Sequence, residues 1–338
     1  MISVNEAINT LLAGSHRLVE TETVPLGSAR GRTLAADLAS PLDVPPADNS
    51  AMDGYALRHA DWPGPESELP IGLRITAGTA PGELAPGKAA RIFTGAEVPQ
   101  GADTVVMQEN CEGTDTTVRI LELPARGANI RPRGQDVKLG QTVLRAAQRL
   151  RPQEVGLAAS LGAPELPVFK RLRVAVLSTG DELVEPGSEA GPGQIYNSNR
   201  YTLNAQLAAW GFEVVDLGVA RDDFEAVRSR MLEAAEAADV IVTSGGVSVG
   251  EEDHVKAVVA SLGSLDLWRI SVKPGKPFAF GQVRGTPFLG LPGNPVSVFV
   301  TLLVIARSYL FACQGISDRS VQALPAKALF SRKRTMRE

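Results

Sequence analysis

The pattern of apolar and polar positions in the second half of the chain predicts a wound α/β domain. Residues 173–177 form an apolar run typical of a buried strand. A helix capped by Ser198 is expected to continue to Trp210 and to end at Gly211. Strands at 212–217 and 240–243 alternate with helices at 224–238 and 253–262. This alternation predicts a parallel sheet with right-handed crossovers, in which ligands bind at the carboxyl ends of the strands.

The first half of the chain has a different pattern. A helix is expected from Ser3 to about Leu12, because Ser3 and Glu6 form a capping-box pair. A loop rich in proline and aspartate follows at 41–53. From there to residue 143, glycine and proline interrupt short β-prone runs such as 104–107 and 117–121, and no long helical period appears. The pattern therefore predicts a β-rich domain inserted into the chain, followed by a helix at 151–161.

Composition narrows the class of protein. Of the 338 residues, 44% are hydrophobic and 21% are charged, which is typical of a soluble globular chain. The net charge of -4 argues against a general nucleic-acid-binding surface. Two cysteines and three scattered histidines exclude a disulfide framework and disfavour a zinc centre. The N-terminus lacks the apolar stretch of a secretory peptide, and the apolar run at 296–306 is too short to span a bilayer. We therefore expect a cytoplasmic protein.

The loops after the predicted strands carry the candidate chemistry. Glycines after a strand let the backbone approach a phosphate, and a helix N-terminus favours its charge. Carboxylates that converge on such an anion indicate a hard cation between them, for which Mg²⁺ fits best. Alternatively, Asp222 and Asp253 only cap helices. The candidate residues in these loops are Thr179, Gly180, Glu182, Asp222, Ser244, Gly245, Gly246, Ser248 and Asp253.

Two later segments add positive charge and rigid turns. Arg269, Lys273 and Lys276 surround a proline-rich turn that suits a phosphate or another tetrahedral oxyanion. The alternative is a solvated surface loop. Pro292 and Pro295 belong to a turn that opens the last helix, whose N-terminal amides are available to an anion.

Several of these motifs resemble a known family. The segments 178–183, 245–250 with Asp253, 273–277 and 291–297 resemble the molybdopterin-binding domain. The segments 49–56, 93–96 and 129–136 are similar to the molybdenum insertases, which comprise MoeA and the gephyrin E domain. The motifs occur in order and cover essentially the whole chain.

The resemblance implies a multi-domain protein of α/β and β type. It implies a linker or dimerisation domain at 21–40 and 141–171 and an inserted β-rich domain at 41–140. The α/β molybdopterin-binding domain would comprise 1–20 and 172–320. Insertases normally end in a small β-barrel domain, and residues 321–338 would be only its beginning, so that this domain is expected to be missing.

The resemblance also implies a homodimeric enzyme that transfers molybdenum from molybdate to adenylylated molybdopterin and releases AMP. Mg²⁺ would lie near Asp222 and Asp253. The residues implied from one subunit are Asp53, Thr94 and Asp136, and those from the partner are Glu182, Asp222, Asp253, Lys273, Lys276, Pro292 and Pro295. Arg131 and Arg269 match basic positions of the family motifs. Arg269 stands where a lysine is also usual, which keeps the charge but changes the hydrogen-bonding geometry.

Two other functions stay open at this point. The related adenylyltransferases share the α/β domain but lack an inserted region such as 41–143, so this region favours the insertase. A gephyrin-like scaffold is a second alternative, although no peptide-binding groove is evident. Docking of a separate adenylyltransferase is a further expectation. The preference for molybdate over tungstate does not follow from the sequence.

Overall fold

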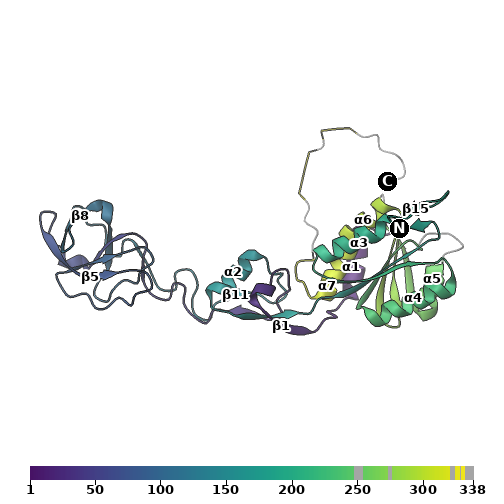
Figure 1. Cartoon of the computed structure of the whole chain (residues 1–338), viewed down its shortest axis with the longest axis horizontal. Helices are drawn as coiled ribbons and strands as arrows, with labels where there is room; N and C mark the ends of the chain where they lie inside the picture. Colours follow the sequence, from purple (N-terminus) through teal and green to yellow (C-terminus); the bar gives the residue numbers. More distant parts are fainter. Residues whose placement is uncertain (247–253, 273–275, 320–323, 328, 332–338) are drawn as a thin grey trace. The chain divides into compact units, whose positions relative to one another are not determined.

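The three strands predicted in the second half are confirmed, and they belong to a larger mixed sheet (Figure 1). The computed structural model describes residues 1–246, 254–272, 276–319, 324–327 and 329–331. The six-stranded sheet has the order β16-β13-β17-β20-β19-β18. Its strands are β13 (Arg173–Thr179), β16 (Glu213–Ala220), β17 (Val240–Ser244), β18 (Gly263–Arg269), β19 (Pro277–Val283) and β20 (Thr286–Leu291).

The prediction of a parallel sheet is correct for four strands and wrong for the remaining part. Strands β16, β13, β17 and β20 run parallel, whereas β19 is antiparallel to both of its neighbours. Strand β19 reaches β20 through Arg284 and Gly285, which both have positive φ angles. A turn of two such residues is typical of a β-hairpin and is too short for a crossover.

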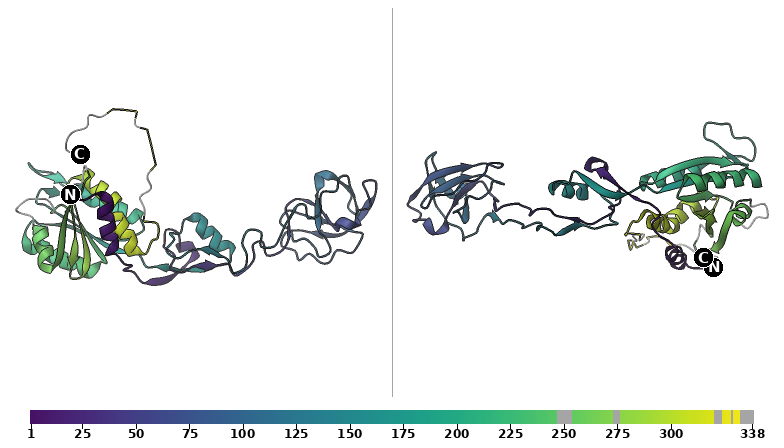
Figure 2. Two further views of the ribbon diagram at one scale, coloured as in Figure 1. Left: turned by 180° about the vertical axis from the view of Figure 1, so that it is seen from behind. Right: turned by 90° about the horizontal axis from the view of Figure 1, so that it is seen from below.

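Helices cover both faces of this sheet (Figures 1 and 2). The apolar residues of β13 alternate between the two layers, because successive side chains of a strand point to opposite faces. Val174 and Val176 pack in one core cluster, whereas Ala175 and Leu177 pack in the other. The first face holds α1 (Val4–Ala13), α3 (Ser198–Ala209), α6 (Pro295–Thr301), a π-helical turn (Leu302–Ala306) and α7 (Arg307–Gln314), and the second holds α4 (Phe224–Ala237) and α5 (His254–Leu262).

The helix caps follow the sequence pattern with one exception. The capping box of Ser3 and Glu6 is confirmed, since each side chain accepts a hydrogen bond from the other's backbone N–H. The predicted cap at Ser198 is wrong, because Asn197 caps α3 and its side chain accepts from Arg200 N. Asparagine and serine are equally good N-caps, so adjacent residues of these types cannot be ranked from sequence.

The segment from Pro295 to Gln314 forms one continuous apolar helix of 20 residues, longer than the predicted run at 296–306. By length and composition alone this helix could cross a membrane. However, 67% of its most apolar window is buried inside the protein. Val298, Leu302 and Ile305 are fully buried in the core beside the sheet. The helix is therefore explained as a core helix of the α/β unit.

The chain divides into two compact units. The larger unit comprises Met1–Ala36, Arg145–Ala159 and Ala163–Glu338, and the smaller comprises Asp37–Leu144 with Ser160–Gly162. Besides the wound sheet, the first part of the chain and the segment after Arg145 contribute paired strands and a short helix. These elements are β1 (Thr21–Pro25), α2 (Pro152–Ser160), β12 (Glu165–Phe169), β14 (Leu183–Val184) and β15 (Ile195–Tyr196).

The smaller unit is built from β-strands, as the sequence predicts, and its residues 41–143 contain no α-helix. Its main sheet has the order β7-β4-β6-β5-β9-β8, and two further pairs are β10-β3 and β11-β2. The strands are β2 (Leu38–Ala39), β3 (Asn49–Ser50), β4 (Gly54–Leu57), β5 (Glu68–Ile75), β6 (Ala89–Ile92), β7 (Thr104–Met107), β8 (Cys111–Gly113), β9 (Thr117–Ile120), β10 (Ile130–Arg131) and β11 (Thr142–Leu144).

Candidate functional site

The carboxyl ends of the parallel strands meet at one edge of the six-stranded sheet. Strands β13, β16, β17 and β20 end at Thr179, Ala220, Ser244 and Leu291. The loops that begin at Gly180, Arg221, Gly245 and Pro292 therefore share this edge, which is called the carboxyl edge below. The rule for ligand sites in wound sheets points to the same place.

The basic residues predicted around the proline-rich turn also reach the carboxyl edge. Strand β18 is antiparallel to β19, which is antiparallel to β20, so β18 runs in the same direction as the parallel strands. Arg269 ends β18, and Lys276 directly precedes β19. Both residues are exposed, and Ile270 N donates to Lys276 O at 2.8 Å. Lys273 lies outside the described residues.

Glycines let three of these loops lie close together. Gly245 N donates to Leu291 O at 3.1 Å, and a Cβ on Gly245 would lie 3.2 Å from Thr179 O. A Cβ on Gly293 would lie 3.8 Å from Gly245 Cα. A Cβ on Gly246, whose φ is +66°, would meet Val255 Cγ2 at 2.3 Å. The glycines are therefore needed for the close packing of these loops, and they leave this part of the edge without side-chain bulk, which suits a phosphate site.

The last of these loops leads directly into α6. Pro292 is buried, and Pro295 is exposed as the first residue of the helix. Asn294 caps the helix by accepting from Ser297 N at 3.2 Å. Both predicted prolines thus belong to the turn between β20 and α6 at the carboxyl edge.

Buried polar side chains lie beneath the loops. Ser178 Oγ and Ser244 Oγ are 3.2 Å apart, and Ser178 Oγ donates to Asn197 Oδ1 at 3.5 Å. Asn197 is 1% exposed, and its Nδ2 has no hydrogen-bond partner within the described parts of the chain. A buried donor without a partner is unfavourable and is a common mark of a ligand or water site. The sequence analysis did not include Asn197 among the site residues.

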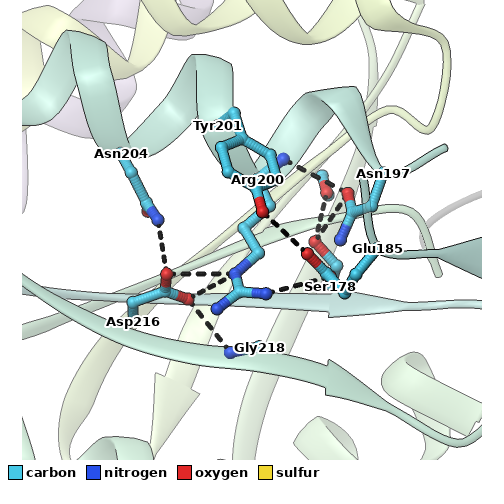
Figure 3. Close-up of polar contacts among 9 residues, drawn as sticks. Ser178, Glu185, Asn197, Arg200, Tyr201, Asn204, Asp216 and Gly218 are labelled. Carbon is cyan, nitrogen blue, oxygen red and sulfur yellow. Dashed lines mark hydrogen bonds and ion pairs between the residues drawn. The ribbon is translucent and has the colours of Figure 1, made fainter. Parts of the chain in front are cut away.

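An ion-pair network fixes α3 beside the carboxyl edge (Figure 3). Arg200 Nε donates to both carboxylate oxygens of Asp216, at 2.8 and 3.0 Å, and Arg200 Nη1 lies 2.9 Å from Glu185 Oε1. Tyr201 Oη donates to Glu185 Oε2 at 3.0 Å. The hydrogen bond to Asp216 is the largest of the effects that raise the pKa of Arg200 above its ordinary value. The network ties the loop after β13 to α3 and to β16.

One residue of this network could have been suspected from its position in the sequence. Arg200 stands in the first turn of α3, where the helix dipole disfavours a cation. A basic residue at such a position indicates that an acidic partner lies nearby in the fold. Neither Glu185 nor Asp216 could be chosen as that partner from spacing alone.

The predicted acidic residues are distributed over two loops at the carboxyl edge. Asp222 N donates to Asp181 Oδ1 at 3.1 Å, so the loops after β13 and β16 are in contact. Asp223, not Asp222, caps α4 by accepting from Ala226 N at 2.9 Å. Glu182 is exposed, and its carboxylate lies over Gly180, where a Cβ would meet Glu182 Oε2 at 2.4 Å. Asp222 is therefore not the N-cap of α4, which was the alternative explanation for this residue.

These carboxylates provide hard oxygen ligands, which suit Mg²⁺. No group of three acidic, histidine or cysteine side chains is gathered among the residues that the structure describes. One or two carboxylates completed by phosphate oxygens are a usual set for Mg²⁺, so the donors at this edge fit the ion. Asp253 and Ser248, which were predicted for this site, lie outside the described residues.

The predicted site residues of the smaller unit gather around β3. Strand β3 pairs with β10, which brings Arg131 opposite Asn49, and Gly95 N donates to Ser50 O at 2.8 Å. Arg131 forms an ion pair with Asp136. Asp53 Oδ1 accepts from both Thr94 N and Thr94 Oγ1, each at 2.7 Å. The motifs at 49–56, 93–96 and 129–136 are thus neighbours in space.

The contacts of Asp53 keep its carboxylate ionised. The hydrogen bond from the backbone N–H of Thr94 is the largest cause that lowers the pKa of Asp53, and the Thr94 hydroxyl and the charge of Arg91 act in the same direction. Because the folded-state pKa is depressed, Asp53 contributes stability above its ordinary pKa and loses it as the pH falls through the depressed value.

We predict that Thr94→Val raises the pKa of Asp53 toward its ordinary value without restoring it fully. The substitution removes the hydroxyl donor but keeps the backbone N–H. A carboxyl-carbon NMR titration of Asp53 measures the change, and Thr94→Ser serves as the control that keeps the hydroxyl. An unchanged pKa in Thr94→Val would show that the hydroxyl bond has no influence on this carboxylate.

Comparison with family models defines the class of protein. Residues 2–162 match the MoeA N-terminal region (domain I and II), and residues 175–312 match a probable molybdopterin binding domain. The chain is 43% identical over 317 residues to the molybdopterin molybdenumtransferase of Haemophilus influenzae, covering 93% of this chain and 78% of that protein. It is 41% identical to the enzyme of the same name from Nostoc sp., covering 83% and 67%.

Solved structures agree with the sequence relatives. A molybdopterin biosynthesis MoeA protein from Pyrococcus horikoshii has a TM-score of 0.82 at 32% identity, covering 95% of this chain and 81% of that one. The chain therefore belongs to the molybdopterin molybdenumtransferase family of enzymes, which confirms the resemblance inferred from the motifs.

Proposed function

We propose that this chain acts in molybdenum cofactor biosynthesis by transferring molybdenum from molybdate to adenylylated molybdopterin, with release of AMP. The observation that supports this most is the convergence at the carboxyl edge of glycine turns, acidic loops and the basic residues Arg269 and Lys276. The substrate carries phosphates and molybdate is a tetrahedral oxyanion, so both need the donors and positive charge found there.

In this proposal the residues of the edge have separate tasks. The backbone around Gly245 and Gly246 would hold the phosphates of the substrate, and Asn197 Nδ2 would donate to it from below. Arg269 and Lys276 would attract molybdate. Asp222, with Asp253, would hold Mg²⁺, which supplies Lewis-acid polarisation of a phosphate oxygen. The two dithiolene sulfurs of the substrate would bind molybdenum as the link to AMP is cleaved.

We also propose that Asp53 and Thr94 of the smaller unit take part, because Asp53 is exposed and stays ionised. An ionised, oriented carboxylate can position a water molecule or accept a proton. The chain is proposed to work as a cytoplasmic homodimer and to receive its substrate from an adenylyltransferase. Light scattering at micromolar concentration tests the dimer independently of activity.

The reaction is tested by mixing the protein with adenylylated molybdopterin, molybdate and Mg²⁺ and measuring AMP. We expect AMP release that requires molybdate and stops when EDTA removes the metal. AMP release at the same rate without molybdate would contradict the proposal. So would formation of adenylylated molybdopterin from ATP and molybdopterin, which would instead assign the chain to the preceding step.

A further inference from the structure

A second candidate site lies in the smaller unit, on the sheet that contains β4, β5 and β6. A cavity of about 510 Å³ opens there. It is distinct from the residues predicted for molybdenum transfer. Its lining residues are Tyr55, Ile71, Arg74, Arg91, Gly113, Thr114 and Asp115.

Strand pairing places the two arginines of the cavity side by side. Arg74 on β5 is opposite Arg91 on β6, and Arg91 is opposite Tyr55 on β4. Both guanidinium groups lie over the ring of Phe93, with Cζ 4.9 Å and 4.6 Å from its centre. Arg91 also lies 5.1 Å from the centre of the Tyr55 ring. The aromatic rings thus provide favourable contacts for both cations on this sheet.

Neither arginine of this pair forms an ion pair with a side chain in the described part of the protein, although the charge of Arg91 acts on Asp53. Arg91 donates to two neutral acceptors, Gly54 O at 2.9 Å and Gln108 Oε1 at 2.7 Å. Arg74 forms no ion pair with a described residue. An anion that contacts both guanidinium groups would be stabilised, because neither group is neutralised by an ion pair.

Tyr55 adds a third donor to the cavity. The residue is only 8% exposed, yet its hydroxyl forms no hydrogen bond with the described residues. A Cβ on Gly113 would lie 2.2 Å from Tyr55 Oη, so only glycine leaves room for the hydroxyl at the cavity wall. Asp115 also lines the cavity, and its carboxylate can accept from hydroxyl groups but would repel a bare anion. The hydroxyl of Thr114, another lining residue, is engaged within its own turn, where it accepts from Thr116 N and Thr117 N.

We propose that this cavity binds a small phosphate monoester that carries hydroxyl groups, as a sugar phosphate does. Arg74, Arg91 and Tyr55 hold the phosphate, and Asp115 accepts hydrogen bonds from the hydroxyl groups. The carboxylate of Asp115 in the lining would repel a free anion, which favours an ester with hydroxyl groups over inorganic phosphate. The inference does not depend on the reaction proposed for the carboxyl edge.

The test uses the intact protein and ribose 5-phosphate as the probe. Phenylglyoxal modifies exposed guanidinium groups, and peptide mass mapping gives the rate at Arg74. We expect ribose 5-phosphate to slow modification of Arg74, and ribose at the same concentration and ionic strength to leave it unchanged. An unchanged rate at Arg74 with saturating ribose 5-phosphate would overturn the proposal, and this result needs no variant to fold.

Variants then separate this site from any phosphate site at the carboxyl edge. Arg74→Ala is expected to weaken binding of ribose 5-phosphate, measured by calorimetry, about 10- to 100-fold at this site, because a charged donor is lost. Arg30→Ala removes the same charge from an exposed position in the other unit and should leave binding unchanged. Equal affinities of wild type and Arg74→Ala would overturn the proposal.

Asp115→Asn should change the affinity for inorganic phosphate in the opposite direction to Arg74→Ala. Removing the carboxylate should strengthen binding of inorganic phosphate about 2- to 5-fold, because a nearby like charge is removed. A variant that merely disturbed the fold would weaken binding of both ligands. Weaker phosphate binding by Asp115→Asn, with an unchanged circular dichroism spectrum, would show that Asp115 does not face the anion and would contradict the assignment.

Discussion

Asp222→Asn is expected to slow molybdate-dependent AMP release about 100-fold or more. The side chain belongs to the loop after β16 at the carboxyl edge, and its backbone N–H is fixed by Asp181. Mutation of residues that only orient metal ligands lowers metal affinity or activity about 10- to 100-fold. Loss of a ligand itself should therefore lower activity by about 100-fold or more. Rates at increasing Mg²⁺ would show the defect as a higher metal requirement.

The neighbouring aspartate gives a matched control. Asp223→Asn removes the same charge one residue away, but asparagine can still cap α4 by accepting from Ala226 N. We expect its activity to stay within about twofold of wild type because the cap is retained. If both variants lost activity equally, the effect would be one of local charge or folding, and the role proposed for Asp222 would be wrong.

Phe288→Ala is expected to have the largest effect on stability, lowering the free energy of unfolding of the larger unit by about 3–5 kcal/mol. Phe288 is fully buried in β20 and packs in the core between the sheet and the layer of α4 and α5. Its register partner on the adjacent strand β19 is Gly281, where a Cβ would meet Ser264 O of β18 at 2.1 Å. The strands therefore cannot move together easily to fill the space that the ring leaves.

Tryptophan fluorescence can measure the unfolding of the larger unit alone. Trp210 and Trp268 lie in the larger unit and Trp62 in the smaller one, so the background variant Trp62→Phe restricts the signal. Urea unfolding should then show a lower midpoint for Phe288→Ala with a similar slope. Leu267→Ala is the control, since Leu267 is 56% exposed and should have little effect. A loss below about 1 kcal/mol for Phe288→Ala would mean that the core relaxes around the missing ring.

Local signals in the sequence identified much of the larger unit. The capping box of Ser3 and the apolar run of β13 each depend on residues close together in the chain, and both are confirmed. Strand β18 escaped detection because it lies at the edge of the sheet and alternates poorly, with Leu267 exposed and only Leu265 and Trp268 partly buried. The glycine at position 285, between the apolar runs of β19 and β20, is a local signal for the hairpin that joins them.

The sequence predicted which edge of the sheet carries the candidate site, but it did not predict most of the contacts between individual residues there. The rule for parallel strands identified the glycine and acidic loops without knowledge of strand order. Arg269 and Lys276 come to the same edge only because β18 and β19 add a hairpin to the sheet, which the sequence pattern did not show. The contacts of Arg200 with Asp216 and Glu185 join residues from three elements and needed the fold.

The proposed function requires the carboxyl edge of the six-stranded sheet to bind the metal and the phosphates of the substrate. Diffraction from crystals grown with AMP and Mn²⁺ in place of Mg²⁺ tests it most directly, because anomalous scattering locates manganese unambiguously. We expect manganese bonded to Asp222, with the nucleotide phosphate against Gly245 and Gly246. Manganese and AMP bound elsewhere, with Asp222 directed into solvent, would contradict it.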